Sequence, residues 1–462
     1  MNIQKLFSAK DMTQGSPWKR IMEFSVPMLI GNIAQQLYNT ADSVIVGIYV
    51  GDNALAAVGS AGPVLMLLMA LFIGISTGAG IVISQAYGAR DRLGLSKNIG
   101  NCISLAAIAS VVIMIIGPVV TMPMLKLLST PASIIDWCAD YLKIYFFGIA
   151  GFFFYNILSG VLRGLGDSVS ALGFLLLAAA LNVILDLVFV AYFGMGVPGV
   201  SLATVIAQLI SAIFCFRKLM KMSDVFDLNK STIKLDKNVA MRIIKIGIPS
   251  GITQAIMSMA NMVVQSLTNS MGEMVIAANV MIMRVDGFAM MPNFSFGQAM
   301  SVYTGQNVGA RKFDRLPTGT KQGMMISVGI SVAITGVLMV LKDFLFGIFT
   351  NTPELIELAG QMMTIMAAGY AGVAITQVLG GVMRGAGDTV SPMWISIITT
   401  IVLRVPLAYI MANMTHSEAW PNGHPFALSA SLLTSWVMGA VISIVVYARG
   451  KWKKVMIAPD PD

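Results

Sequence analysis

An acidic residue, Asp42, lies inside a long apolar stretch of the sequence, residues 21–50, and no Lys or Arg falls within one helical turn of it. A charged side chain at the depth of a lipid bilayer costs roughly 2.5–3.5 kcal/mol on insertion scales, so it is rare there unless a partner or a water-filled cavity receives it. Asp42 is therefore predicted either to bind a cation or a proton, or to make a hydrogen bond where two helices meet.

Two further apolar stretches carry oxygen-bearing side chains that could complete such a site. Asn182 and Asp186 are four residues apart in the stretch 168–193, so they share one face of a helix. Thr204 lies in the next stretch. Such oxygens suit a hard cation such as Na⁺, and two neighbouring carboxylates can equally hold a proton. We expect Asp42 and these three residues to form one site for Na⁺ or H⁺.

The second half of the chain carries a different set of polar residues. Position 264, which corresponds to Asp42 in the repeat described below, is Val. Asp286 is accompanied by Arg284 and Arg404, and the sequence leaves open whether Asp286 belongs to a site or is neutralised by one arginine. Three acids lie within the spans against these two bases, an excess that attracts cations. The candidates for a substrate cavity are Gln36, Tyr38, Asn39, Gln254, Asn261, Gln265, Arg284, Asp286 and Arg404.

The composition predicts an all-α polytopic membrane protein that must position these residues within helices. Apolar residues make up 56% of the 462 and charged residues only 11%, whereas soluble domains carry about a quarter charged residues. Roughly 20 residues cross the hydrocarbon core. Twelve apolar stretches are long enough to span, at residues 21–50, 54–86, 98–128, 132–162, 168–193, 199–220, 241–270, 274–306, 319–349, 353–383, 389–414 and 427–448. Pro27 interrupts the first stretch and is expected to act as a hinge.

The basic residues set the expected orientation. With the amino terminus in the cytoplasm, all but five of the 30 Lys and Arg residues fall in cytoplasmic segments, the exceptions being Lys126, Lys143, Arg284, Lys342 and Arg404. Such a bias places both termini in the cytoplasm of a multi-pass plasma membrane protein. It also accounts for the net charge of +8 without nucleic acid. Residues 1–20 show no cleavable signal peptide.

An internal repeat divides the spans into two sets of six. Residues 160–170 read GVLRGLGDSVS and residues 381–391 read GVMRGAGDTVS, with eight of eleven positions identical. An even number of spans returns each half to its starting side, so the halves are parallel repeats, and substrates bind between such repeats near the midplane. We expect an amino-terminal bundle at 1–220, a cytoplasmic linker at 221–240 and a carboxy-terminal bundle at 241–462.

Motifs for several other functions are missing from the sequence. It holds no Gly-Lys-Ser/Thr phosphate loop and no His-Glu-x-x-His, so neither an ATP motor nor a zinc-dependent hydrolase is indicated. His416 and His424 lie in one expected loop, and the three cysteines fit neither a disulfide framework nor a metal spacing. We expect no enzyme activity, no structural metal and no cofactor beyond the coupling ion.

Five segments together resemble one family of transporters. They are SVPMLIGNIAQQLYNTADSVIVG in the first span, GARDRLG and GARKFDR after the second and eighth, the paired turns RGLGDS and RGAGDT, and PNFSFGQAMSVYTGQNVGA in the eighth. Nearly end to end, the chain is similar to bacterial members of the multidrug and toxic compound extrusion (MATE) family. This resemblance implies two six-helix bundles in a V, alternating access, and export of cationic amphipathic compounds in exchange for Na⁺ or H⁺.

The resemblance also assigns residues. It carries a first-half cation site onto Asp42, Asn182, Asp186 and Thr204. Some relatives use an acid in the seventh span, which this chain lacks, although Asp286 resembles an acid of the eighth span in related sequences. We therefore expect a monomeric antiporter whose partners are small organic cations and the lipid bilayer. A flippase for lipid-linked precursors, from the same superfamily, is the alternative; it would need a cationic cavity, to which Arg284 and Arg404 could contribute.

Overall fold

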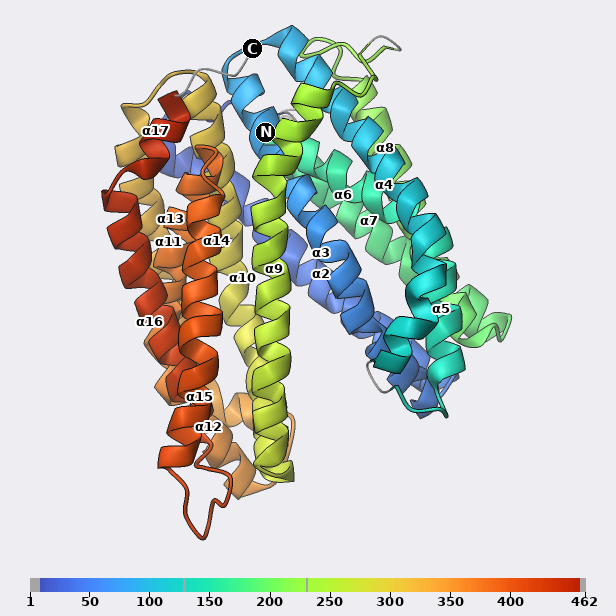
Figure 1. The fold of residues 1–462 in the computed structure, drawn as a ribbon, viewed down its shortest axis with the longest axis vertical. Helices are drawn as coiled ribbons and strands as arrows, with labels where there is room; N and C mark the ends of the chain where they lie inside the picture. Colours follow the sequence, from blue (N-terminus) through green and yellow to red (C-terminus); the bar gives the residue numbers. More distant parts are fainter. Residues whose placement is uncertain (1–8, 128–129, 230–231, 458–462) are drawn as a thin grey trace. The chain divides into compact units, whose positions relative to one another are not determined.

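The structure, a computed structural model, describes residues 9–127, 130–229 and 232–457. Within these ranges the secondary structure is helical throughout, without a strand. The first repeat contains α2 (Pro17–Tyr49), α3 (Asp52–Gly88), α4 (Arg92–Leu127), α5 (Ile135–Phe147), α6 (Ile149–Gly164), α7 (Ser168–Asp186), the π-helix η1 (Leu187–Tyr192) and α8 (Gly196–Met220). Figure 1 shows these helices from blue to green.

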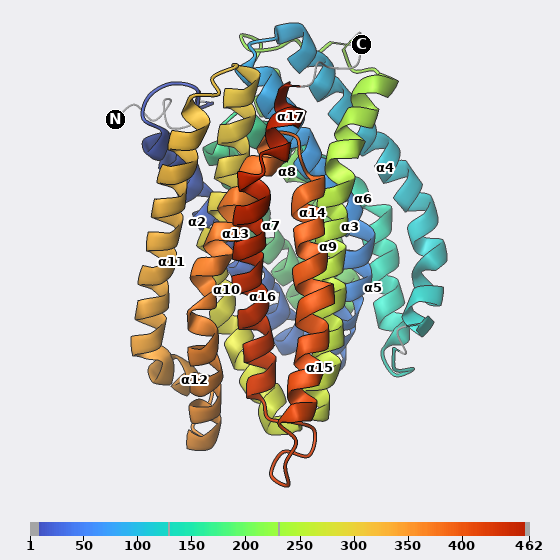
Figure 2. The ribbon, with the colours of Figure 1, turned by 60° about the vertical axis from the view of Figure 1, so that its left-hand side comes forward.

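The second repeat follows the same order with one additional break. It contains α9 (Lys237–Ser270), α10 (Glu273–Gly309), α11 (Arg315–Gly347), α12 (Pro353–Ala367), α13 (Gly369–Gly385), α14 (Val390–Ser396), the π-helix η2 (Ile397–Arg404), α15 (Val405–Met414) and α16 (Phe426–Ala448), with the short α17 (Lys451–Ile457) after it. Figure 2 shows these helices from a second side. The two central helices correspond: α6 packs against α3, α4 and α8, and α13 packs against α10, α11 and α16.

The predicted class, an all-α polytopic membrane protein with two repeats, is confirmed. In the described part of the chain, nine helices are long and apolar enough to cross a membrane, and two bent pairs raise the number to eleven. Helix α2 is not among them. Polar side chains from Gln35 to Ser43 lower its hydropathy, and Asp42 is one of them.

Two stretches predicted as single spans are broken. The stretch 132–162 bends by 55° between α5 and α6, and the stretch 353–383 bends by 45° between α12 and α13. Gly148 lies at the first break, where a Cβ atom would collide with the side chain of Val205. Gly369 begins α13, where a Cβ atom would collide with Trp436. Each break thus lies where a neighbouring helix approaches the backbone.

The chain forms two compact units. Unit 1 contains residues up to Asp11 together with Val26–Gly251, and unit 2 contains Met12–Ser25 together with the residues from Ile252 onward. Helices α2 and α9 therefore each contribute to both units, and Pro27 and Pro249 lie within two residues of the points of change. The predicted domain boundaries at 220 and 241 remain a prediction.

Glycines allow α9 to approach α3 within unit 1. A Cβ atom on Gly78 would lie 2.6 Å from the Ile243 carbonyl oxygen, and one on Gly247 would lie 2.6 Å from the Cα of Ile75. Gly74 and Gly251 meet in the same way. Each helix thus presents two glycines four residues apart, the spacing that lets helix backbones pack closely in membranes.

Candidate functional site

Helices α7 and α8 place three of the predicted site residues together in unit 1. Asn182 and Asp186 lie one turn apart on α7 and face Thr204 of α8. All three are buried, Asn182 and Asp186 completely. In the amide orientation that satisfies both its ends, Asn182 donates to the Asp186 carboxylate at 2.9 Å and accepts from the Thr204 backbone N–H at 3.2 Å. The amide thereby fixes the carboxylate of Asp186 against α8.

Asp42 of α2 completes this group. Its carboxyl group lies within hydrogen-bonding reach of the Asp186 carboxyl group. One turn earlier on α2, the Tyr38 hydroxyl lies within hydrogen-bonding reach of Thr204. The structure therefore brings Asp42, Asn182, Asp186 and Thr204 into one cluster, and it adds Tyr38, which the sequence suggested only as a lining residue. We call these five residues the acidic cluster.

Two tyrosines of α5 border the acidic cluster and were missed from the sequence. Tyr141 and Tyr145 are 6% and 7% exposed. Their ring centroids are 6.1 Å apart, and Tyr141 lies close enough to Asp42 and Asp186 to interact electrostatically with both. The only sequence signal is their spacing of four residues, which puts both rings on one helix face. That spacing is equally common in apolar packing, so it did not indicate a site.

Within the described residues, the acidic cluster has carboxyl oxygens without hydrogen-bond partners and without a base that acts on them. One carboxyl oxygen of Asp42 and one of Asp186 are buried without a hydrogen bond in the described structure. Of the described charged residues, the one that acts on each carboxyl is the other carboxyl. Two carboxyl groups at this range need a shared proton or a bound cation, because both cannot remain ionised side by side. The π-helix η1 begins directly after Asp186, and such irregular turns are frequent at functional sites.

The second half holds a different group, made by Asp286 of α10, Tyr370 of α13 and Arg404 at the end of η2. The Asp286 carboxyl group faces the Tyr370 hydroxyl and the Arg404 guanidinium. Arg404 also donates to the Asn261 side chain at 2.8 Å. An Asp286 oxygen, the Tyr370 hydroxyl and the Arg404 Nε are each buried without a hydrogen bond in the described structure. We call Asp286, Tyr370, Arg404 and Asn261 the mixed cluster.

This arrangement answers the question of which arginine faces Asp286. Arg404 acts on Asp286 electrostatically, whereas the Arg284 side chain is exposed. Among the described residues no ion pair within 4.0 Å joins Asp286 to either arginine. Val264, at the position that corresponds to Asp42, is 7% exposed and packs in an apolar core. Tyr370 could not be found from the sequence, because nothing there links α13 to α10.

The other candidate lining residues are scattered over α2 and α9. Asn39 is exposed and accepts a hydrogen bond from Gln35 at 3.3 Å. Gln265 donates to Asn269 at 2.8 Å. Gln36 and Gln254 are partly buried. In the described residues no group of three or more His, Cys, Asp or Glu side chains could hold a metal ion. The donor set of the acidic cluster is thus two carboxyls with neutral oxygens.

Comparisons with known proteins agree with the repeat and the fold. A family model described as MatE matches the chain twice, over residues 27–188 and 249–410. The probable multidrug resistance protein YoeA of Bacillus subtilis is 29% identical over 456 residues, which cover 96% of this chain and 96% of that protein. The probable multidrug resistance protein NorM of Thermotoga maritima is 24% identical over 443 residues, covering 94% of this chain and 93% of that protein.

Solved structures share the fold over nearly the whole chain. A multidrug resistance MATE family transporter of the MOP superfamily, in an outward-facing conformation, superposes with a TM-score of 0.89 at 23% identity, covering 98% of this chain and 99% of that one. A MOP superfamily transporter from Pyrococcus furiosus superposes with a TM-score of 0.87 at 24% identity, covering 97% and 98%.

Proposed function

The chain belongs to the multidrug and toxic compound extrusion family of membrane transporters, and on that premise we propose that it is a secondary antiporter. It exports cationic amphipathic organic compounds and takes up Na⁺ or H⁺ in exchange. It works as a monomer in the plasma membrane, with both termini in the cytoplasm, as the distribution of basic residues favours. The names of its relatives, probable multidrug resistance proteins, support export of small organic compounds.

One observation carries the proposal: two facing carboxyl groups, Asp42 and Asp186, without a base beside them in the described structure. Such a pair binds one positive charge strongly, either as a shared proton or as a sodium ion. Asn182 and Thr204 supply neutral oxygens to the same ion. Coupling requires that the bound ion favour one of the two access states over the other. Neutralising the carboxyl pair provides this difference, because the charged pair is costly in a closed, dry state.

An organic cation competes for the same negative charge. When it enters from the cytoplasm it displaces the coupling ion, and the ion that enters from outside displaces it in turn. In this mechanism Asp42 carries the coupling charge, Asp186 shares it, and Pro27 is the hinge through which α2 responds. The candidate lining residues Gln36, Asn39, Gln254, Gln265 and Arg284 contact the organic compound rather than the ion.

The test is efflux of a fluorescent organic cation from proteoliposomes, with a sodium gradient and a pH gradient imposed separately. Efflux that occurs when one of the two gradients is imposed, and stops when that gradient is omitted, supports the antiporter and identifies the ion. Efflux that responds to neither gradient contradicts the proposal. If the same protein instead translocates a lipid-linked pyrophosphate across the bilayer, the flippase replaces the antiporter.

A further inference from the structure

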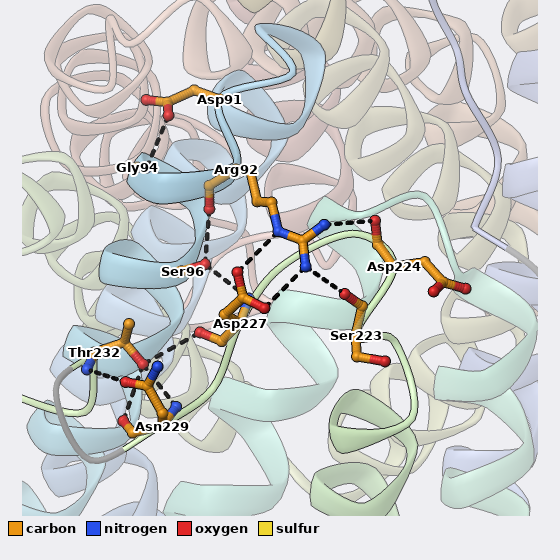
Figure 3. Close-up of polar contacts among 9 residues, drawn as sticks. All are labelled: Asp91, Arg92, Gly94, Ser96, Ser223, Asp224, Asp227, Asn229 and Thr232. Atoms are coloured by element: carbon orange, nitrogen blue, oxygen red, sulfur yellow. Dashed lines mark hydrogen bonds and ion pairs between the residues drawn. The ribbon is translucent and has the colours of Figure 1, made fainter.

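The polar segment between α8 and α9 binds to the corner where α3 meets α4 in unit 1, as Figure 3 shows. We call its described residues, 223–229 and 232–236, the linker strap. Arg92, the first residue of α4, donates to both carboxylate oxygens of Asp227 at 2.8 Å. It also donates to the carbonyl oxygens of Ser223 at 2.7 Å and Asp224 at 3.3 Å. One side chain therefore holds three residues of the strap.

Further contacts hold the rest of the linker strap on α4. The Ser96 hydroxyl accepts from the Asp227 N–H at 2.9 Å, and the Asn101 side chain accepts from the Asp236 N–H at 2.8 Å. Phe226 is 1% exposed and belongs to the apolar core of unit 1. Gly100 has no room for a Cβ atom because the Thr232 carbonyl lies against it. The described linker strap is thus attached to α4 near both of its ends.

The segment before α2 binds to the corresponding corner of unit 2. We call residues 12–16 the amino-terminal strap. Arg315, the first residue of α11, donates to the Gly15 carbonyl at 2.8 Å. Lys312 donates to the Thr13 carbonyl at 2.9 Å. Asn307 donates to the Met12 carbonyl at 3.2 Å, and Gln306 accepts from the Met12 N–H at 2.8 Å.

The two corners lie at corresponding places in the two repeats, between the second and third long helices, although the repeat offset of 221 carries Arg92 onto Phe313 and not onto Arg315. Gln85 and Gln306 are repeat partners, and each binds the incoming segment: Gln85 accepts from Arg242 of α9 at 3.1 Å, and Gln306 binds the amino-terminal strap. Arg92 and Arg315 each begin the third long helix of a repeat and each reach a strap carbonyl. Each strap leads into the first helix of one repeat, and that helix changes unit beside a proline.

We propose that Arg92 and Arg315 are positioning residues for transport. Arg92 fixes the start of α9 to unit 1, whereas the rest of α9 belongs to unit 2. Arg315 fixes the start of α2 to unit 2, whereas the rest of α2 belongs to unit 1. The proposal rests on the alternating access proposed above. The chain crosses between the units inside α2, inside α9 and between Asp11 and Met12. If both starts are fixed, the helical crossings must take up movement between the units next to Pro27 and Pro249, where each proline removes a backbone hydrogen bond. If a strap were released, the helix after it could move as a whole with one unit. Ion binding at Asp42 in unit 1 would then no longer be coupled to movement of unit 2.

The experiment compares Arg92→Ala with Lys97→Ala, which removes the same charge from an exposed position on the same helix. Purified full-length proteins are digested with trypsin, and cleavage after Lys234 in the linker strap is followed by mass spectrometry. We expect Arg92→Ala to raise the initial cleavage rate by about fivefold or more, because its charge-assisted hydrogen bonds close the strap against α4. Gradient-driven efflux should fall by about the same factor, while Lys97→Ala changes neither.

A conservative variant separates geometry from charge. Arg92→Lys keeps the charge but loses the fork that contacts Asp227 and the two carbonyls together, so we expect it to behave like Arg92→Ala. The exchange Arg92→Asp with Asp227→Arg should restore part of both readouts. If Arg92→Ala fails to insert, Asp227→Asn takes its place in the comparison. Arg315→Ala, with Lys321→Ala as its control, repeats the measurement at the second corner by cleavage after Lys19.

Each result decides the matter. Unchanged cleavage in Arg92→Ala would show that Arg92 does not hold the strap. Faster cleavage with unchanged efflux would leave the strap held but would overturn the positioning role, as would equal loss of efflux in Lys97→Ala. A wild-type protein without gradient-driven efflux would contradict the antiporter, whereas the cleavage comparison would still decide whether Arg92 holds the strap.

Discussion

The two repeats share a backbone but not a charge pattern. In unit 1 the acidic cluster sets Asp42 against Asp186 with no base beside them in the described structure. In unit 2 the mixed cluster sets Asp286 against Arg404, and Val264 occupies the position that corresponds to Asp42. The acidic cluster therefore needs a positive charge from a bound ion or proton, whereas the mixed cluster already contains the positive charge of Arg404. The comparison suggests that one half binds the coupling ion and the other half orients polar groups of the cargo.

The largest effect is expected when one carboxyl group of the acidic cluster is removed, so that the cluster no longer needs a cation to balance its charge. Asp42→Asn preserves the shape but leaves a single carboxyl group, so gradient-driven efflux should fall at least about 100-fold, to the background of empty liposomes. Asp140→Asn removes a carboxylate from an exposed position on α5 and should transport normally. Retained sodium- or pH-driven efflux in Asp42→Asn would move the coupling site elsewhere.

The reverse change tests whether unit 2 tolerates an acid where unit 1 has one. Val264→Asp places a carboxylate in an apolar core. We expect a loss of about 2.5–3.5 kcal/mol of stability, seen as a lower melting temperature in detergent. Val264→Asn, which is polar but uncharged, should lose less. A Val264→Asp protein as stable as wild type would mean that unit 2 already holds a second acid site.

The mixed cluster should respond as a coupled pair. Asp286→Asn leaves the Arg404 charge without its opposing charge, and Arg404→Gln does the same to the Asp286 charge. Each substitution should lower the free energy of unfolding by about 1–3 kcal/mol. The double variant should cost less than the sum of the two, by about 1 kcal/mol, in a double-mutant cycle on thermal stability. Strict additivity would show that the two charges do not act on each other.

The smallest effect concerns the two straps, which differ in charge as the two clusters do. Arg92 holds the pKa of Asp227 below its ordinary value through their hydrogen bonds, whereas Arg315 binds neutral acceptors, Gly15 and Asn307. The carboxylate contribution is complete above the ordinary Asp pKa of about 4 and is lost as the pH falls through the lower folded value. Amide exchange, corrected for intrinsic rate, should therefore stay constant in both straps from pH 8 to 5.

Below pH 4, faster exchange should appear in the linker strap before the amino-terminal strap. If both straps loosen together, the charge of Asp227 is not what distinguishes them. If the linker strap already loosens between pH 7 and 5, a group other than Asp227 controls it.

Sequence patterns predicted the helices, the two repeats and part of the acidic cluster, because such patterns depend on local geometry. The four-residue spacing of Asn182 and Asp186 fixed their common face, and the repeat fixed the equivalence of the two halves. Patterns along one chain do not report which helices meet, so Tyr141 and Tyr370 were missed and Arg284 could not be separated from Arg404. The straps were missed for another reason: their contacts are backbone carbonyls and N–H groups, which every sequence possesses.

The division of α2 between the units has a consequence for biogenesis. Met12 finds its hydrogen-bonding partner Gln306 294 residues later in the chain. Ribosomes add about 5–20 residues per second, so the first segment to emerge waits roughly 15–60 s for the helix that receives it. During that time Met12–Ser25 lacks the later part of unit 2, to which it belongs. A fragment ending before α9 would therefore keep this segment undocked, and adding the second half as a separate chain should dock it.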